Sequence, residues 1–108
     1  MDFEFDELKK EFLTEAEGKI GEIVDCLKAD KPDRPALDRM IYLAHQLKGA
    51  GGSYGFQTIS TEAAALESVV EQLSHGAGDL ESARRRADNL VKIVDEGTRE
   101  LDERLARR

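Results

Sequence analysis

The sequence has no tryptophan, two prolines and one cysteine, and its apolar residues never form a long run. A single cysteine, Cys26, excludes an internal disulfide, and a reducing cytoplasm is the simplest compartment for such a chain. A membrane-spanning helix needs about 18 consecutive apolar residues, and a secretion signal needs a basic segment that leads into an apolar one. Neither pattern is present, so we expect a cytoplasmic domain with no membrane association.

Positive charge is also scarce. The chain has 16 lysines and arginines against 23 aspartates and glutamates, which gives a formal net charge of -7. Binding to a phosphate backbone depends on a basic face, so this balance argues against a nucleic-acid partner and favours a protein partner or a small ligand. With 108 residues, of which 40% are hydrophobic, the chain has the size of one domain with one core, residues 1–108.

The first predicted helix covers about residues 4–29. Its apolar residues recur at spacings of three and four, which is typical of one face of an amphipathic helix. These residues are Phe5, Leu8, Phe12, Ala16, Ile20, Ile23 and Leu27. The segment "DKPDRP" then ends the helix, because proline cannot continue one. Pro35 suits the first turn of the next helix, with Asp33 close to its cap.

Three further helices are predicted at about residues 35–54, 57–74 and 79–106. Gly55 can supply a left-handed cap after the second helix, and Asp79 can cap the start of the fourth. No strand pattern with a period of two appears. The fold class is therefore all-α, an antiparallel up-down-up-down four-helix bundle with a long C-terminal helix. The apolar pattern of that helix runs about 28 residues, or roughly 42 Å, so we expect it to extend past the others.

The stretch "HQLKGAGGSYG", residues 45–55, places four glycines where a helix should be reinforced. On a helical wheel His45 lies just off the edge of the apolar arc, so we expect it to be partly exposed. Residues three, four and seven positions further along share its surface, and these are Lys48, Gly49 and Gly52. Each internal glycine costs about 0.5 to 1 kcal/mol relative to alanine. Gly49 and Gly52 are explained if another molecule has to approach the imidazole.

A neutral imidazole is a good nucleophile near pH 7, and a phosphoryl group on its nitrogen is labile enough to be passed on. Lys48 could neutralise phosphoryl oxygens as a point charge. A carboxylate bonded to the other ring nitrogen would fix the tautomer, and Glu67 on the third helix is the candidate. Taken singly, His45 could equally be a half-buried polar residue, and Glu67 a solvated surface glutamate. A phosphate-binding loop is set aside because the Gly-Lys-Ser/Thr ending and a preceding strand are both absent.

These residues resemble the histidine phosphotransfer (HPt) domain family, whose signature is a histidine, a lysine three residues later, a glycine directly after it and a second glycine ten after the histidine. Here these positions hold His45, Lys48, Gly49 and Gly55, and the small Gly52 also matches. The resemblance covers nearly the whole chain. Within the family, "FLTEAEGKIGEI" and "AHQLKGAGGSYGFQTIS" look most like the N-terminal phospho-accepting domain of chemotaxis-type (CheA-like) histidine kinases. That subgroup commonly has a glutamate 22 residues beyond the histidine, bonded to its ring, which implies that role for Glu67.

The resemblance implies a phosphorelay carrier of two-component signal transduction. Nε2 of His45 would accept a phosphoryl group from a histidine kinase's ATP-binding domain or a receiver, and would pass it to the aspartate of a response-regulator receiver domain. The receiver would bring the Mg²⁺, so no cofactor or metal is expected in the chain itself. Ile41 and Phe56 could help to dock the receiver, although each could equally be a core residue. Dimerisation, ATP-binding and coupling domains are missing, so we expect no kinase activity from this chain alone, whether it is a stand-alone carrier or an excised domain.

Two readings from other classes stay open. A metal-binding bundle would need more ligands than His45 and His75 provide, since di-metal bundles use Glu-x-x-His pairs and none occurs here. A helical scaffold would pair the heptad-like fourth helix with a partner helix, without any phosphotransfer.

Overall fold

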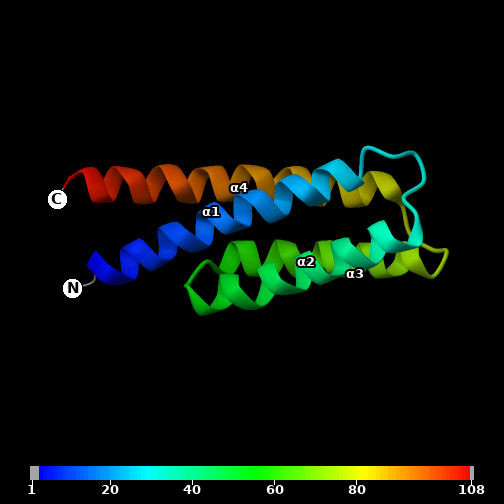
Figure 1. Ribbon diagram of the computed structural model, residues 1–108, viewed down its shortest axis with the longest axis horizontal. Coiled ribbons are helices and arrows are strands. Elements are labelled where there is room, and N and C mark those ends of the chain that lie inside the picture. Colours follow the sequence, from blue (N-terminus) through cyan, green and yellow to red (C-terminus); the bar gives the residue numbers. More distant parts are fainter. Residues whose placement is uncertain (1–2, 108) are drawn as a thin grey trace.

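The protein is a bundle of four helices with no strand among residues 3–107, which are the residues that the computed structural model describes (Figure 1). The helices are α1 (Phe3–Cys26), α2 (Arg34–Ser53), α3 (Gln57–Ser74) and α4 (Leu80–Ala106). Successive helices run in opposite directions, and each packs against its neighbours in the order α1, α2, α3, α4 and back to α1. The predicted all-α, four-helix architecture is confirmed.

Helix α1 ends at Cys26, three residues before the expected end at residue 29. The Leu27 amide still donates to the Ile23 carbonyl at 3.0 Å, but the chain then turns. Arg84 of α4 provides the reason, because its guanidinium donates to the carbonyl oxygens of Leu27 at 2.9 Å and Ala29 at 3.3 Å. Carbonyls at a helix end need partners, and a side chain from another helix satisfies these two.

Helix α2 begins and ends with capping residues that the sequence contains at the expected places. Asp33 is the N-cap, and its carboxylate accepts a hydrogen bond from the Ala36 amide at 3.0 Å. After Ser53 the chain passes through Gly55 at a φ of 84°, and the Phe56 amide donates to the Gly51 carbonyl at 2.7 Å. This pair of features is a Schellman motif, in which a left-handed glycine closes the last turn.

One continuous core lies inside the bundle, with every helix contributing to it. Its fully buried large side chains are Leu13, Ile20, Ile23, Met40, Leu43, Leu47, Ile59, Leu66, Val70, Leu90 and Val94. Within the described residues, no helix combines the length and the apolar character that crossing a membrane requires.

At one end α1 and α4 extend together beyond the turn between α2 and α3, and both termini lie there (Figure 1). Phe5 and Leu8 were expected on the buried face of α1, but they are 42% and 44% exposed. The turn after α2 covers them only in part, since the Phe5 ring stacks on Tyr54 with centroids 6.3 Å apart. Asp6 is buried at this end together with Leu101, and its carboxylate accepts a hydrogen bond from Arg104 of α4 at 2.6 Å. The overhang contributes to the elongated shape, 50 × 21 × 18 Å.

Candidate functional site

His45 projects into solvent from the middle of α2, with 64% of its side chain exposed. Its neighbours Ala44 and Leu47 are buried in the core, at 0% and 1% exposure. These buried residues fix the rotation of α2 about its own axis, and this rotation holds His45 at the outer edge of the seam between α2 and α3.

Glu67 of α3 reaches across this seam to the imidazole ring. Its Oε2 atom lies 3.0 Å from Nδ1 of His45, and only 13% of the glutamate side chain is exposed. In the tautomer that protonates Nδ1, the ring donates to this carboxylate and the lone pair stays on Nε2. Among the described residues Nε2 has no hydrogen-bond partner, so this atom can react with an incoming group.

Lys48 forms an ion pair with the second oxygen of the same carboxylate. Its Nζ atom lies 3.1 Å from Oε1 of Glu67, and 40% of the lysine side chain is exposed. Glu67 therefore connects the imidazole and the ammonium, which lie one helical turn apart on α2. The sequence suggests Lys48 and Glu67 as separate candidates, but it gives no sign of the ion pair between them, because the pair depends on how α3 is rotated.

The glycines in this stretch have three different structural roles. A Cβ atom at Gly51 would lie 3.2 Å from the Ser60 amide nitrogen and 3.3 Å from the Phe56 carbonyl, so Gly51 lets the backbones of α2 and α3 approach closely. A Cβ at Gly49 would meet nothing within 4 Å, and one at Gly52 would meet only the Ser60 hydroxyl at 3.8 Å. Gly49 and Gly52 thus leave the surface bare, while Gly55 caps the helix.

The two apolar candidates for docking lie in different places. Ile41 is partly buried against the core. Phe56 points away from the His45 seam, since its ring stacks on Phe12 of α1 with centroids 5.6 Å apart. Its contacts therefore favour a packing role in the core over a docking role. The exposed apolar side chain near His45 is instead Tyr42, three residues earlier on α2 and 53% exposed.

Tyr42 is not among the residues predicted from the sequence, although its position three residues before the histidine could have indicated it. Its hydroxyl accepts a hydrogen bond from Gln46 at 2.8 Å, and the Arg39 guanidinium lies 5.6 Å from the ring centroid. Two neighbours on the same helix thus hold the ring in place at the surface.

The site contains a nucleophile, a cation and open space, and it contains no cluster of metal ligands. Nowhere in the described part of the chain do three or more histidine, cysteine or acidic side chains gather closely enough to hold a metal ion. The geometry of His45 and Glu67 suits nucleophilic attack by an imidazole whose other nitrogen is held by a carboxylate.

Comparisons with known proteins identify a family and a relative. The family model described as "Hpt domain" matches residues 7–107. The chemotaxis protein CheA of Halobacterium salinarum is 29% identical over 93 residues, which cover 83% of this chain and 14% of that relative. The chain thus spans about one seventh of the length of this curated relative. No solved structure matches the chain significantly.

The family match includes all four helices from the second turn of α1 to the end of α4, and hence the whole seam around His45. By this match the chain belongs to the Hpt domain family.

Proposed function

We propose that this chain is a phosphoryl carrier, in which His45 accepts a phosphoryl group on Nε2 and passes it to a receiver aspartate. The observation that carries this proposal is the exposed His45 ring, whose Nδ1 lies 3.0 Å from the Glu67 carboxylate. Membership of the Hpt family supports histidine phosphotransfer in two-component signalling as the general activity.

The carrier needs only two displacement steps at phosphorus. In the first, the Nε2 lone pair attacks the phosphorus, the bond to the donor's leaving group breaks, and the Nδ1 proton stays hydrogen-bonded to Glu67. In the second, a carboxylate oxygen of the receiver attacks, the N–P bond breaks, and its electron pair returns to Nε2. Glu67 stabilises the positive charge that the ring carries in the phosphorylated state.

Lys48 supplies the positive charge for the phosphoryl oxygens. Its ammonium carries three donors, and one of them is used on Glu67 in the unphosphorylated protein. A phosphoryl group on Nε2 would therefore find a cation already held within one helical turn. Because the amine is 40% exposed, it can turn to the new anion without disturbing the core.

The partners that follow are a histidine kinase's ATP-binding domain as donor and a response-regulator receiver domain as acceptor. The receiver would bring its own acidic pocket and Mg²⁺, and the bare surface at Gly49 and Gly52 would admit that pocket. Tyr42 offers an apolar docking contact beside the histidine.

A place in chemotaxis-type signalling in the cytoplasm is the finer form of this proposal. It is supported by the likeness to a chemotaxis protein, over a short part of that relative's length. Kinase activity would then reside in other domains, and this chain would act as their substrate.

The test is to incubate the purified protein with a histidine-kinase ATP-binding domain and radiolabelled ATP, and with phosphoramidate as a partner-independent donor. We expect label that is stable in alkali and lost in acid, as phosphohistidine is. The variant His45→Gln should abolish labelling, while the matched control His75→Gln, at the exposed end of α3, should label normally. Unchanged labelling of His45→Gln would remove the proposal.

A further inference from the structure

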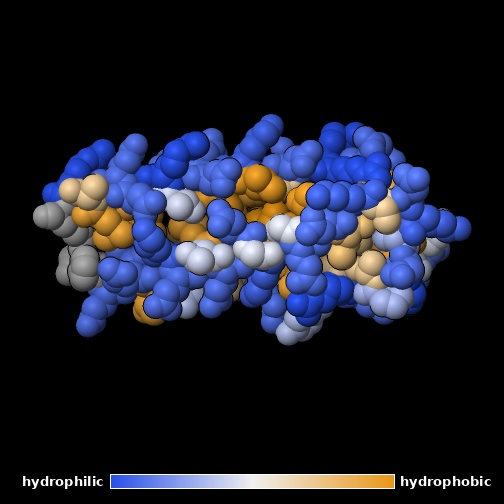
Figure 2. Space-filling view, turned by 45° about the horizontal axis from the view of Figure 1, so that its top comes forward, coloured by the Kyte–Doolittle hydropathy of each residue, from blue (hydrophilic) through white to orange (hydrophobic). Residues whose placement is uncertain are grey.

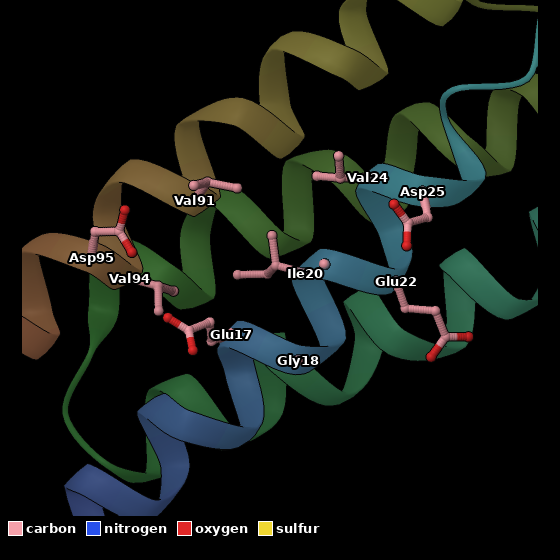
Figure 3. Close-up of a pocket in the computed structure, with 10 residues that line it drawn as sticks. Glu17, Gly18, Ile20, Glu22, Val24, Asp25, Val91, Val94 and Asp95 are labelled. Carbon is pink, nitrogen blue, oxygen red and sulfur yellow. The ribbon is translucent and has the colours of Figure 1, made fainter.

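A hollow of about 650 Å³ lies between α1 and α4, where Ile20 and Val24 of α1 meet Val91 and Val94 of α4 (Figure 3). In the described part of the chain each helix contacts only its two neighbours in the ring. The seam between α4 and α1 is therefore opposite the seam between α2 and α3 that holds His45. A molecule bound in this hollow would therefore leave the imidazole of His45 uncovered.

The floor of the hollow is apolar. Ile20 and Val94 belong to the core, while Val91 is 37% exposed and so presents a methyl surface to water. Figure 2 shows several patches of apolar surface among hydrophilic residues, one of them in the middle of the face. An apolar floor between two helices can take the apolar face of a third helix.

Two glycines make the hollow accessible from the α1 side. Gly18 and Gly21 line it, and a Cβ atom at either would meet nothing within 4 Å. Neither glycine ends the helix or lets another backbone approach, so no packing requirement within the chain explains it. Because these two positions have no side chain, the α1 side of the hollow stays open. Each glycine lowers the stability of the helix relative to alanine.

The rim of the hollow is acidic. Its charged residues are Glu17, Glu22, Asp25 and Asp95, and no lysine or arginine is among the lining residues. Glu22 and Asp25 form ion pairs with Arg39 and Lys28. Glu17 and Asp95, which lie at the same end of the hollow on α1 and α4 (Figure 3), have no ion-pair partner among the described residues.

We propose that this hollow is a docking site for a basic amphipathic helix of a partner protein. The apolar floor would take side chains spaced three and four residues apart, and Glu17 and Asp95 would pair with flanking lysines or arginines. Charge complementarity selects this occupant over a second copy of the chain. A two-fold dimer through the seam would bring two acidic rims together, and like charges in an interface are repulsive.

The size of the seam fits a short helix. A second hollow of about 290 Å³ continues past Val24 as far as Arg84, so the seam runs along α4 from Arg84 to Asp95. The second hollow is lined by apolar residues, by Asp88, and by Lys28 and Arg84, whose charges are already paired with Asp25 and Glu81. At 1.5 Å per residue the stretch from Arg84 to Asp95 is roughly 16 Å long, which matches about three turns of a partner helix. Such a partner could hold the carrier while His45 stays free to exchange its phosphoryl group.

The experiment titrates ¹⁵N-labelled protein at low salt with a synthetic peptide of leucines and lysines in helical spacing, and with its leucine–glutamate counterpart. We expect the lysine peptide to shift the amide resonances of Gly18, Gly21 and Val91, and to leave those around His45 unchanged. The double variant Glu17→Gln/Asp95→Asn should bind it about three- to tenfold more weakly. The matched control, Asp30→Asn/Glu71→Gln, loses the same charge at exposed positions elsewhere and should bind as the wild type does.

Three results would overturn the proposal. Equal weakening in both double variants would mean that only the net charge of the protein attracts the peptide. Shifts spread over the surface or centred on the His45 seam would place binding elsewhere. Concentration-dependent dimerisation in analytical ultracentrifugation, lost in Val91→Asp, would assign the hollow to a second copy instead.

Discussion

At the scale of single residues, one carboxylate organises the candidate site. Glu67 is mostly buried and accepts from the ring of His45 with one oxygen and from the ammonium of Lys48 with the other. A carboxylate used in this way fixes both the tautomer of the imidazole and the position of the cation, without itself contacting the transferred phosphoryl group. Glu67 is therefore a positioning residue in this account.

Replacing Glu67 should slow the reaction without damaging the fold. We expect Glu67→Ala to take up phosphoryl groups about ten- to hundredfold more slowly, as outer-shell changes beside reactive groups typically do. Glu67→Gln keeps an oxygen for Nδ1 and should lose less. The measurement is the rate of labelling from phosphoramidate, with thermal melting as the check on folding. An unchanged rate in Glu67→Ala would return the residue to an ordinary surface glutamate.

Cys26 permits a prediction that does not depend on function. Burial, together with the negative charges of Glu22, Asp25 and Asp33, raises the pKa of its thiol. Because the thiolate is the reactive form, we expect Cys26 to react with Ellman's reagent at pH 8 several-fold more slowly than glutathione does. Unfolding in urea should remove the difference. A rate in the native protein equal to that of glutathione would contradict the burial seen here.

The reactive residues are the part of the site that the sequence predicts best. His45, Lys48 and the bare positions at Gly49 and Gly52 lie on one helix, so their relative placement follows from helical spacing alone. Glu67 and Phe56 depend on how two helices are rotated against each other. The sequence could name Glu67 as a candidate, but it could not exclude a solvated glutamate, and it offered Phe56 for docking although that ring packs on α1.

At the scale of elements, the hairpin of α2 and α3 combines close packing with an open surface. Gly51 lies where the two backbones meet, and Gly49 lies two residues earlier on the solvent side. The Ser60 hydroxyl adds a hydrogen bond to the Lys48 carbonyl at 2.8 Å and so ties α3 to the helix that carries the histidine.

This arrangement predicts opposite effects for two similar substitutions. Gly51→Ala should destabilise the protein by about 1 kcal/mol or more, because backbone atoms of Phe56 and Ser60 would have to move away from the new methyl group. Gly49→Ala should stabilise it by about 0.5 to 1 kcal/mol, since the methyl group enters open space within a helix. Urea denaturation measures both, and the same sign for the two variants would show that the helices are packed differently.

The helices themselves were predictable because their apolar residues repeat at spacings of three and four and their ends carry capping residues. Asp33, Asp79 and Gly55 act locally, so a sequence pattern is enough to place them. The end of α1 was not predictable in this way. Arg84, 57 residues further along the chain, donates a hydrogen bond to the carbonyl oxygen of Leu27. A local sequence pattern cannot predict a contact between residues so far apart.

At the scale of the whole molecule, the overhang of α1 and α4 is held by an ion pair between the two ends of the chain. Asp6 is 3% exposed, and the Arg104 guanidinium lies 2.6 Å from its carboxylate. The exposed Phe5 and Leu8 show that apolar burial is incomplete here. Polar contacts between the two helices therefore carry more of the stability at this end.

Removing this contact should destabilise the protein measurably. We expect Arg104→Ala to lower the free energy of unfolding by about 1 to 2 kcal/mol, because a buried carboxylate loses a charged donor. The control is Arg107→Ala, which loses only an exposed pair with Glu103 at 3.9 Å and should change stability by less than about 0.5 kcal/mol. If urea unfolding shows no difference between the two variants, the Asp6 contact does not hold the overhang.

The two proposals concern seams on opposite sides of the bundle, one with His45 and one with the acidic hollow. The claim at the centre of the account is that Glu67 holds Nδ1 and leaves Nε2 to react. Two-dimensional NMR of the phosphorylated protein, with ¹⁵N in the imidazole rings, shows directly which nitrogen is bonded to phosphorus. We expect a single N–P bond at Nε2 of His45, and a phosphoryl group on Nδ1 or on any other residue would contradict the role proposed for Glu67.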